Sequence, residues 1–344
     1  MLQRAARAGI VVAGAPLAGW LAACADAGVA PRPSLTPRPS PSPTEAPTAT
    51  PTQEPAATPD ARPVTIAITG DVMLGRSVGD RILATGDRFP FNDTADFLHD
   101  FDLTVGNLEC VVSRQGQPVP NKPYHFRADP TCYGRLNAAG FDVVSLANNH
   151  SGDFGTAAFA DMLAALPDHG IAPLGAGMNL TAAHQPVIRT VRATTVGFLA
   201  YCEIVPMSFA ATATSPGHAW LDTALMRADI AALRQHVDFL VVFMHWGLEY
   251  VTRDTAAQQA TARRAVEAGA DVVVGSHPHV IQPSETYAGK PIVYSLGNFV
   301  FDEMYEDAVR RGNVLTLTVQ GAQLLDWKLR PSYIAGNDGA PRWA

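Results

Sequence analysis

The sequence predicts an α/β fold in which strands and helices alternate along one large domain. Short apolar runs rich in β-branched residues, typical of buried strands, recur between residues 64 and 319. Helical patterns with start and stop signals lie between several of these runs. This alternation is typical of an architecture whose central strands are buried and covered by helices.

The first predicted strand is the run VTIAITG at residues 64–70, which ends in glycine. Six further strands are predicted at residues 101–105, 142–146, 238–244, 271–275, 291–296 and 314–319. A strand pair within residues 187–201 is expected to be antiparallel.

Two helices carry clear boundary signals. Residues 130–139 follow Asp129 as an N-cap, with proline at the first helical position and glycine at 140 as the stop. Residues 256–268 follow Thr255, have Gln258 as the capping-box partner, and stop at Gly269. One domain from residue 63 to 335, followed by a C-terminal tail at 336–344, accounts for all these elements.

Composition narrows the functional classes. The chain has 344 residues, of which 47% are hydrophobic, so it has enough apolar side chains for a sizeable core. Its formal net charge of −7 and the lack of a long basic run argue against a nucleic-acid partner. Four cysteines without a C-x-x-C pair argue against a cysteine zinc site or a disulfide scaffold.

Residues 1–23 have the pattern of a lipoprotein signal peptide. Two arginines precede an uncharged stretch at residues 8–23, which is shorter than the roughly 20 apolar residues that a spanning helix needs. The stretch ends Leu21-Ala22-Ala23-Cys24 and resembles a bacterial lipobox, which implies acylation of the Cys24 thiol and a lipid anchor in the membrane. An ordinary signal peptide, cut after Ala25 or Ala30, is the alternative.

Residues 24–62 are predicted to be a disordered tether. Within residues 31–60, ten residues are proline and six are threonine, and the only large apolar side chain is Leu35. Such a segment buries too little surface to offset its ordering entropy. A lipid anchor followed by a tether predicts an extracytoplasmic, membrane-anchored protein of the cell envelope.

Polar side chains follow successive predicted strands, and this pattern predicts a metal site. The residues are Asp71, then Asn107 and Glu109, then Asn149, His150 and Asp153, then His245, then His277 and His279, and finally Asn298. Open α/β sheets bind ligands beyond the carboxyl ends of their strands. Oxygen and imidazole donors without sulfur favour one or two divalent ions of the Mn, Fe or Zn type.

Six sequence runs carry a family resemblance. The runs GDVML, NLE, SLANNH, HWGLEY, GADVVVGSHPHVIQ and YSLGNFVFD occur in this order over residues 70–302. They resemble the signature blocks of CapA-like capsule and poly-γ-glutamate biosynthesis proteins, a branch of the calcineurin-like metallophosphoesterase superfamily. The resemblance implies a two-sheet sandwich flanked by helices, α/β/β/α, with a dinuclear metal centre at the strand ends.

The resemblance also implies roles for individual residues. Asp71 and His279 would bind the first metal, Glu109 would bridge, and Asn149, His245 and His277 would bind the second. His150 matches the histidine that protonates a leaving group. Two positions depart from the superfamily: Met73 replaces a histidine ligand of the first metal, and the bridging residue is Glu rather than Asp.

A second group of polar residues is predicted to contact substrate or to orient the ligands: Asn107, Asp153, Lys122, Arg127, Glu249 and Asn298. Lys122 and Arg127 lie in one loop, where they either grip an anionic substrate or are simply solvated. Asn298 is expected to orient the histidines.

Two functional interpretations remain open at this point. In the first, the protein is a hydrolase whose metal activates water against a phosphoester, ester or amide of an envelope polymer or its precursor. In the second, it is a non-catalytic accessory protein that binds an anionic polymer through the metal beside a separate membrane-bound synthetase. The sequence has no GxxxxGK[ST] motif, so this chain is not expected to activate glutamate with ATP.

Overall fold

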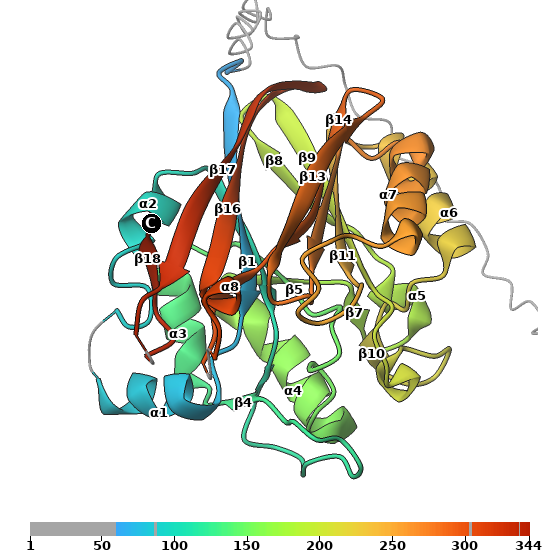
Figure 1. Ribbon diagram of the computed structural model, residues 1–344. Helices are drawn as coiled ribbons and strands as arrows, with labels where there is room; N and C mark the ends of the chain where they lie inside the picture. The colour runs from blue at the N-terminus through green and yellow to red at the C-terminus, as the bar shows by residue number, and fades with distance from the viewer. Residues whose placement is uncertain (1–59, 86–87, 303–304, 337) are drawn as a thin grey trace, which may run out of the picture. The chain divides into compact units, whose positions relative to one another are not determined.

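The computed structural model describes residues 60–85, 88–302, 305–336 and 338–344 (Figure 1). The predicted signal peptide, Cys24 and all but the last three residues of the predicted tether lie outside the described residues. No helix within the described part is both long and apolar enough to cross a bilayer.

Two large sheets make up the centre of the described domain. The first sheet has the order β18 (Pro341–Trp343), β17 (Gln323–Ile334), β16 (Arg311–Gln320), β1 (Val64–Val72), β2 (Leu103–Leu108), β5 (Val143–Ser145), β6 (Ala172–Leu174), with β15 (Asn298–Val300) beside β1. The second sheet has the order β13 (Ile281–Tyr287), β14 (Lys290–Leu296), β12 (Val272–Ser276), β11 (Phe239–His245), β9 (Thr194–Cys202), β8 (Val187–Val191). Strands β1, β2, β5 and β6 are parallel, and so are β9, β11, β12 and β14.

Smaller elements complete the domain. Two-stranded sheets pair β3 (Val111–Val112) with β4 (Arg127–Ala128), and β7 (Ala176–Gly177) with β10 (Gly217–His218). The helices are α1 (Arg76–Ala84), α2 (Ala95–His99), α3 (Thr131–Ala138), α4 (Gly155–Asp168), α5 (Leu180–Ala183), α6 (Thr223–Arg234), α7 (Ala256–Ala268) and α8 (Asp307–Arg310), with a 3₁₀ turn at Met207–Phe209.

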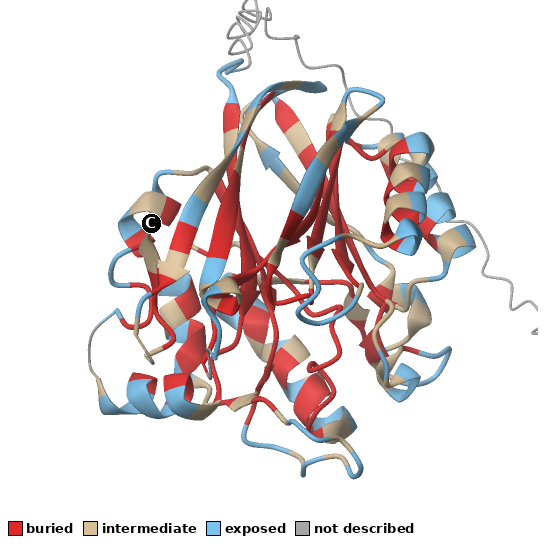
Figure 2. Cartoon of the chain, viewed as in Figure 1, coloured by how far each residue is buried: buried red, intermediate tan, exposed pale blue. Residues whose placement is uncertain are grey.

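The core has three layers, as a helix-flanked sandwich requires. In β1, Ile66 and Ile68 belong to the apolar layer between the two sheets, and Ala67 belongs to the layer under α1, α3 and α4. A third layer packs α6 and α7 onto the outer face of the second sheet. The strands that face both layers are buried along almost their whole length (Figure 2). The predicted α/β fold, a two-sheet sandwich flanked by helices, is confirmed.

Several local predictions hold in detail. The α7 capping box is present, with Thr255 N donating to Gln258 Oε1 over 2.9 Å and Gln258 N donating to Thr255 Oγ1 over 3.1 Å. Strands β8 and β9 are antiparallel. Helix α3 begins at Thr131, one residue later than predicted, and its first N–H donates to Asp129 Oδ1.

Other boundaries differ from the prediction. Strand β2 runs from 103 to 108 rather than from 101 to 105, and it includes Gly106 and Asn107. These residue types have low strand propensity, but β2 is paired on both sides by β1 and β5, so tertiary pairing overrides propensity. The segment set apart as a tail contains β18, whose Trp343 packs against Phe97 with ring centroids 4.6 Å apart.

Candidate metal centre

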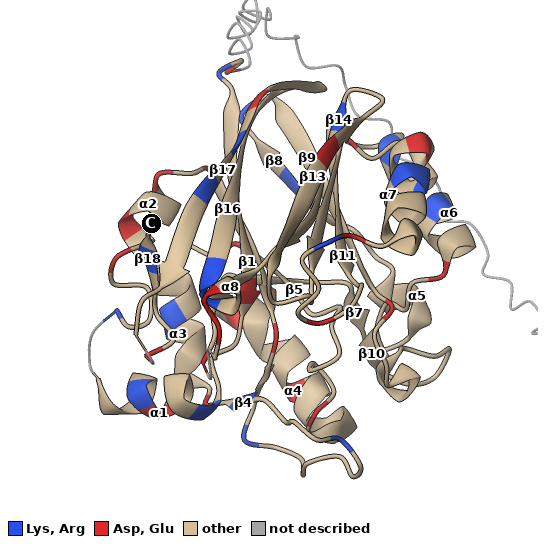
Figure 3. Cartoon of the chain, viewed as in Figure 1, with Lys and Arg blue, Asp and Glu red and all other residues tan. Residues whose placement is uncertain are grey.

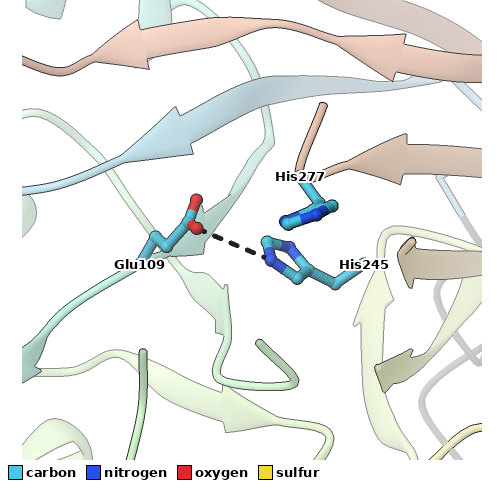
Figure 4. A group of neighbouring side chains, drawn as sticks. All are labelled: Glu109, His245 and His277. Carbon is cyan, nitrogen blue, oxygen red and sulfur yellow. Dashed lines mark ion pairs between the residues drawn. The ribbon is translucent and has the colours of Figure 1, made fainter. Parts of the chain in front are cut away.

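The predicted ligands meet where the carboxyl ends of strands from both sheets face each other. The ligand atoms of Glu109, His245 and His277 all lie within 4.8 Å of one another, and the same holds for Asp71, Glu109 and His279. Figure 4 shows the Glu109 carboxylate directed at the His245 ring with His277 beside it; Oε1 of Glu109 is 3.5 Å from Nε2 of His245. Glu109 is therefore common to both groups of ligands.

A close backbone approach places Asp71. A Cβ on Gly70 would lie 2.0 Å from the carbonyl oxygen of Gly297, so only glycine fits where β1 passes this loop. Asp71 N donates to that same carbonyl over 3.1 Å. Its carboxylate accepts from Asn107 Nδ2 at 2.8 Å and from the backbone N–H of His277 at 3.2 Å, which fixes both oxygens.

The His277-Pro278-His279 segment has an unusual backbone. His277 has φ of 96° and His279 has φ of 57°, values that non-glycine residues rarely adopt. Such strain persists where the surrounding structure holds it, and it is common at functional sites. The result is that two consecutive turns of the chain direct both imidazoles toward the cluster, with ring centroids 5.8 Å apart.

Oxygen atoms from neighbouring residues orient the imidazoles. His245 has Ser276 Oγ 2.9 Å from Nδ1, which leaves Nε2 facing two other predicted ligands, Asn149 Oδ1 at 2.8 Å and Glu109 Oε1 at 3.5 Å. His279 Nδ1 lies 3.0 Å from Asn298 Oδ1. Partners of this kind select the ring tautomer and orientation of a metal-binding histidine. The predicted orienting role of Asn298 thus has a specific contact.

The electrostatics of the cluster call for a cation. Burial raises the pKa of Glu109 well above its ordinary value, and the charge of Asp71 raises it further. Burial, and then the neighbouring imidazoles, lower the pKa of His245 and His277 well below the ordinary value. Within the described residues, Oε1 of Glu109 and Nδ1 of His277 are buried without a hydrogen-bond partner. A divalent cation satisfies both atoms, so these residues fit a metal of the Mn, Fe or Zn type.

The two ligand groups are chemically unequal. Met73, at the position where the resemblance implies a histidine in related proteins, is fully buried in the core, and its sulfur accepts from Gly75 N over 3.1 Å. The group of Asp71, Glu109 and His279 therefore offers one imidazole, whereas the other group offers two. Glu249 is exposed and forms a third group with His277 and His279.

His150 lies beside the cluster in a tightly held pair with Asp153. Its Nδ1 is 2.7 Å from Asp153 Oδ2, and its ring stacks on Phe126 with centroids 3.8 Å apart. Lys122 Nζ is 2.7 Å from Asp153 Oδ1 and 2.9 Å from Nδ1 of His150. Backbone N–H of Phe126 also donates to Asp153, over 2.7 Å. Asp153 thus anchors both the histidine and the loop that covers it.

The two basic residues of the predicted substrate loop have different places. The Lys122 side chain is only 11% exposed and is engaged by Asp153, so it supports His150. The Arg127 guanidinium lies 3.6 Å over the Phe154 ring and donates to the carbonyls of Gln115 and Gly116. Arg127 holds the loop together and is not among the residues that line the cavities beside the cluster.

Three contributors were missed by the sequence analysis. Ser276 contacts His245, Asn148 Nδ2 donates to Asn107 Oδ1 over 3.0 Å, and Phe126 stacks on His150. Ser276 and Asn148 stand directly before predicted ligands, which is a signal that could have found them. Phe126 has no comparable signal in the sequence.

Two cavities open beside the cluster. The smaller, of about 250 Å³, is lined by His150, His279 and Asn298 together with aromatic residues. The larger, of about 990 Å³, is lined by Asn149, His150 and His277 among others. His150 borders both, so ligands entering from either side reach it and the metal-ligand cluster.

The two-sheet sandwich, with a cluster of oxygen and imidazole side chains at its strand ends that could hold a metal, has the metallophosphoesterase fold. The calcineurin-like phosphoesterase YfkN from Bacillus subtilis is similar over 82% of this chain and 93% of that chain, with a TM-score of 0.50 and 17% sequence identity, a likeness of fold alone. The family described as bacterial capsule synthesis protein PGA_cap matches residues 65–303, and the chain belongs to this family.

Two curated relatives show the extent of the similarity. The capsule biosynthesis protein CapA of Bacillus anthracis is 32% identical over 70% of this chain and 60% of its own length. The PGA biosynthesis protein CapA of Bacillus subtilis (strain 168) is 32% identical over 70% of this chain and 64% of its own length. The match therefore spans less than two thirds of these relatives.

Proposed function

We propose that this protein acts in the synthesis of a capsule or poly-γ-glutamate-type envelope polymer, where it hydrolyses a phosphoester, ester or amide bond of the polymer or its precursor. Membership of the capsule synthesis family supports a role in polymer synthesis, and the names of the two relatives agree with this role. The proposed hydrolysis rests on one observation: the His150–Asp153 pair lies next to a buried cluster of oxygen and imidazole side chains. Two cavities open onto this cluster.

The roles follow from the contacts. Asp71, Glu109 and His279 would hold one cation, and Glu109, Asn149, His245 and His277 a second. Divalent cations at such a site supply Lewis acidity toward water and toward the substrate oxygen. Asp153 binds Nδ1 of His150 and fixes the ring, while the stacked Phe126 restricts its rotation. Burial lowers the pKa of His150 to about 4, and Asp153 offsets part of this because it stabilises the ring protonated on both nitrogens. In that form His150 donates the Nε2 proton to the leaving oxygen or nitrogen, a step typically worth about 10²–10⁴-fold in rate.

The proposal extends to the location of the protein. The lipobox before Cys24 and the Pro/Thr-rich tether support an extracytoplasmic domain held at the membrane by lipid. Such a position gives the domain access to an envelope polymer and to membrane-bound synthetase components. The cell-envelope role of the capsule synthesis family is consistent with this location.

The test compares wild type with His150→Asn, using the full chain supplemented with Mn²⁺. We expect hydrolysis of bis-p-nitrophenyl phosphate or p-nitrophenyl acetate by wild type, and a loss of about 10²–10⁴-fold in kcat in the variant. Metal content, measured by atomic spectroscopy, should be unchanged. The matched control is His236→Asn at an exposed position. Bound metal without turnover of any ester in wild type would contradict hydrolysis and favour the non-catalytic accessory role.

A further inference from the structure

The walls of the two cavities indicate what kind of substrate the site accepts. We infer, as a refinement that rests on the proposed function, that the substrate presents one anionic group to the metal centre between uncharged, hydroxyl-rich rings. Of the two kinds of polymer in the proposed function, a capsular glycan with sugar phosphate units has this chemistry, whereas poly-γ-glutamate, a continuous polyanion, does not.

The exposed tyrosines of this protein gather at one cavity. Of the eight tyrosines in the chain, three are exposed: Tyr124 at 61%, Tyr250 at 64% and Tyr305 at 85%. All three line the smaller cavity beside the cluster. The Tyr250 ring also lies beside the ring of His279, with centroids 6.2 Å apart.

A second layer of rings forms the inner wall of this cavity. Phe126 and Phe301 pack edge to face with centroids 5.6 Å apart, and Phe301 lies 4.8 Å from the ring of His279. Apolar ring faces therefore continue from the exposed rim to the metal ligands. Pockets of this kind bind flat or ring-shaped groups by contact area, with a few polar groups that set orientation.

The cations in the walls are already engaged by carboxylates. Arg76 forms an ion pair with Asp302, and its guanidinium lies over the Phe126 ring. Lys122 pairs with the buried Asp153. No lysine or arginine other than these two is found among the described residues that line the cavities.

The charges that remain in the walls are negative. Apart from Asp302, the acidic side chains that line the cavities are Glu203, Glu249 and Glu306. Figure 3 shows acidic residues beside α8, where this wall lies. Away from the cations of the metal centre, the walls therefore disfavour a run of carboxylates, because like charges repel one another.

A sugar ring matches both properties of the walls. Its C–H faces are apolar and pack on tyrosine faces, and its hydroxyls donate to carboxylate oxygens. A single phosphate attached to it reaches the metal centre. Because Tyr124, His150 and Glu249 border both cavities, the metal centre lies between two binding spaces, and a unit inside a longer glycan fits as well as a terminal one.

The test measures binding, so that it does not depend on turnover. Calorimetry on the Mn²⁺-supplemented full chain compares inorganic phosphate, glucose 1-phosphate and γ-linked triglutamate. We expect glucose 1-phosphate to bind at least 10-fold more tightly than phosphate, and triglutamate to bind more weakly than glucose 1-phosphate. In EDTA-treated protein, maltotriose should show saturation transfer in NMR spectra, a readout that needs no metal.

Substitutions of the tyrosines distinguish the contribution of the aromatic rings to binding from that of the metal. Tyr250 has φ of 63°, a conformation that asparagine tolerates, so Tyr250→Asn removes the ring without added backbone strain. In this variant, and independently in Tyr124→Ala, we expect the affinity for glucose 1-phosphate to fall to within about 3-fold of the affinity for phosphate. The affinity for phosphate should be unchanged, and the maltotriose signal should be lost. Leu325→Ala on β17, at a position 48% exposed, is the matched control and should change nothing. Glu306→Lys should tighten triglutamate binding several-fold.

The opposite results would overturn the inference. These are triglutamate binding more tightly than glucose 1-phosphate, adenosine monophosphate outcompeting glucose 1-phosphate, or no maltotriose signal in wild type. A wild-type protein that binds glucose 1-phosphate in this order but hydrolyses no ester would refute the proposed hydrolysis and leave the substrate class standing. A protein that hydrolyses esters without the sugar preference would refute the substrate class and leave the proposed hydrolysis standing.

Discussion

A buried histidine remote from the proposed chemistry yields a quantitative stability prediction. His218, in β10, is fully buried and stacks near Trp220 with ring centroids 6.2 Å apart. Within the described residues, neither of its ring nitrogens has a hydrogen bond of good geometry. Burial lowers the pKa of His218 to about 4, and a backbone contact at Ala219 offsets this only in part.

The lowered pKa sets the size and the sign of the effect. Against the ordinary value of 6.5, a folded-state pKa of about 4 means that the unfolded chain binds the proton more tightly. Stability is therefore lost as pH falls through the unfolded value, and the full loss, about 3 kcal/mol, is reached below the folded value. Between pH 7 and pH 5 the contribution of this one group amounts to about 2 kcal/mol.

The assay is urea denaturation of wild type and His218→Met at several pH values between 7 and 5, with EDTA present. Methionine fills a similar space and does not titrate. Other buried histidines, including His245 and His277, destabilise both proteins in acid, so the difference between the two isolates His218. We expect the stability of the variant relative to wild type to rise by about 2 kcal/mol between pH 7 and pH 5.

Parallel stability curves for the two proteins would refute this reasoning. They would mean that His218 binds protons equally well in the folded and unfolded states, which requires a hydrogen-bond partner for the charged ring in the folded protein. An offset between the curves that is constant with pH reports only packing at the substituted site, so the slope of the difference, and not its absolute value, is the quantity to measure.

Three further predictions concern the metal site, its support and the anchor. Calorimetric titration of EDTA-treated protein with Mn²⁺ should show two unequal binding steps, or one. The reason is that the group with Glu109, His245 and His277 offers two imidazoles, whereas the group with Asp71, Glu109 and His279 offers one. Two equal, tight steps would contradict this. Lys122→Met leaves the buried Asp153 carboxylate without its cation and should lower the free energy of unfolding by about 3–5 kcal/mol. Lys122→Arg keeps the cation and should retain most of the wild-type stability. Equal urea midpoints for the two variants would argue against the ion pair. Mass spectrometry of the membrane fraction should find acylated Cys24 at the mature N-terminus, and an unmodified chain beginning after Ala25 would disprove the anchor.

The architecture was predictable because its signals are local. The strands VTIAITG and DFLVVFM are rich in β-branched or aromatic residues, and a polar residue directly follows each, so both the strand and the position of its site residue follow from one short segment. Parallel strands bring such ends to the same edge of a sheet. That rule places Asp71 with the strand ends of the first sheet and His245 with those of the second, and the sandwich implied by the family resemblance brings the two edges together.

What escaped prediction depends on contacts between distant parts of the chain. Lys122 meets His150 and Asp153 across about thirty residues of sequence, and nothing in the loop itself distinguishes a lysine that supports a histidine from one that binds substrate. The three exposed tyrosines come from three separate segments, and only the fold brings them to one cavity. Arg127 was expected near a substrate, but its guanidinium covers Phe154, because a planar cation packs well on an aromatic face.

The metal centre and the stability of the fold are coupled through the same buried groups. Without a cation, Glu109 is a buried carboxyl whose pKa is raised beside Asp71, and His245 and His277 must stay neutral, so the cluster opposes folding. The continuous apolar layer between the two sheets, to which β1, β9 and β11 each contribute, offsets this cost and lets the cluster form at the strand ends. A cation that binds the folded protein alone adds about 2.7 kcal/mol of stability at a free concentration 100 times its dissociation constant. Removal of the metal should therefore affect the strand ends around Glu109 and His277 first, because the unsatisfied atoms are there, while the inter-sheet layer keeps the sandwich folded.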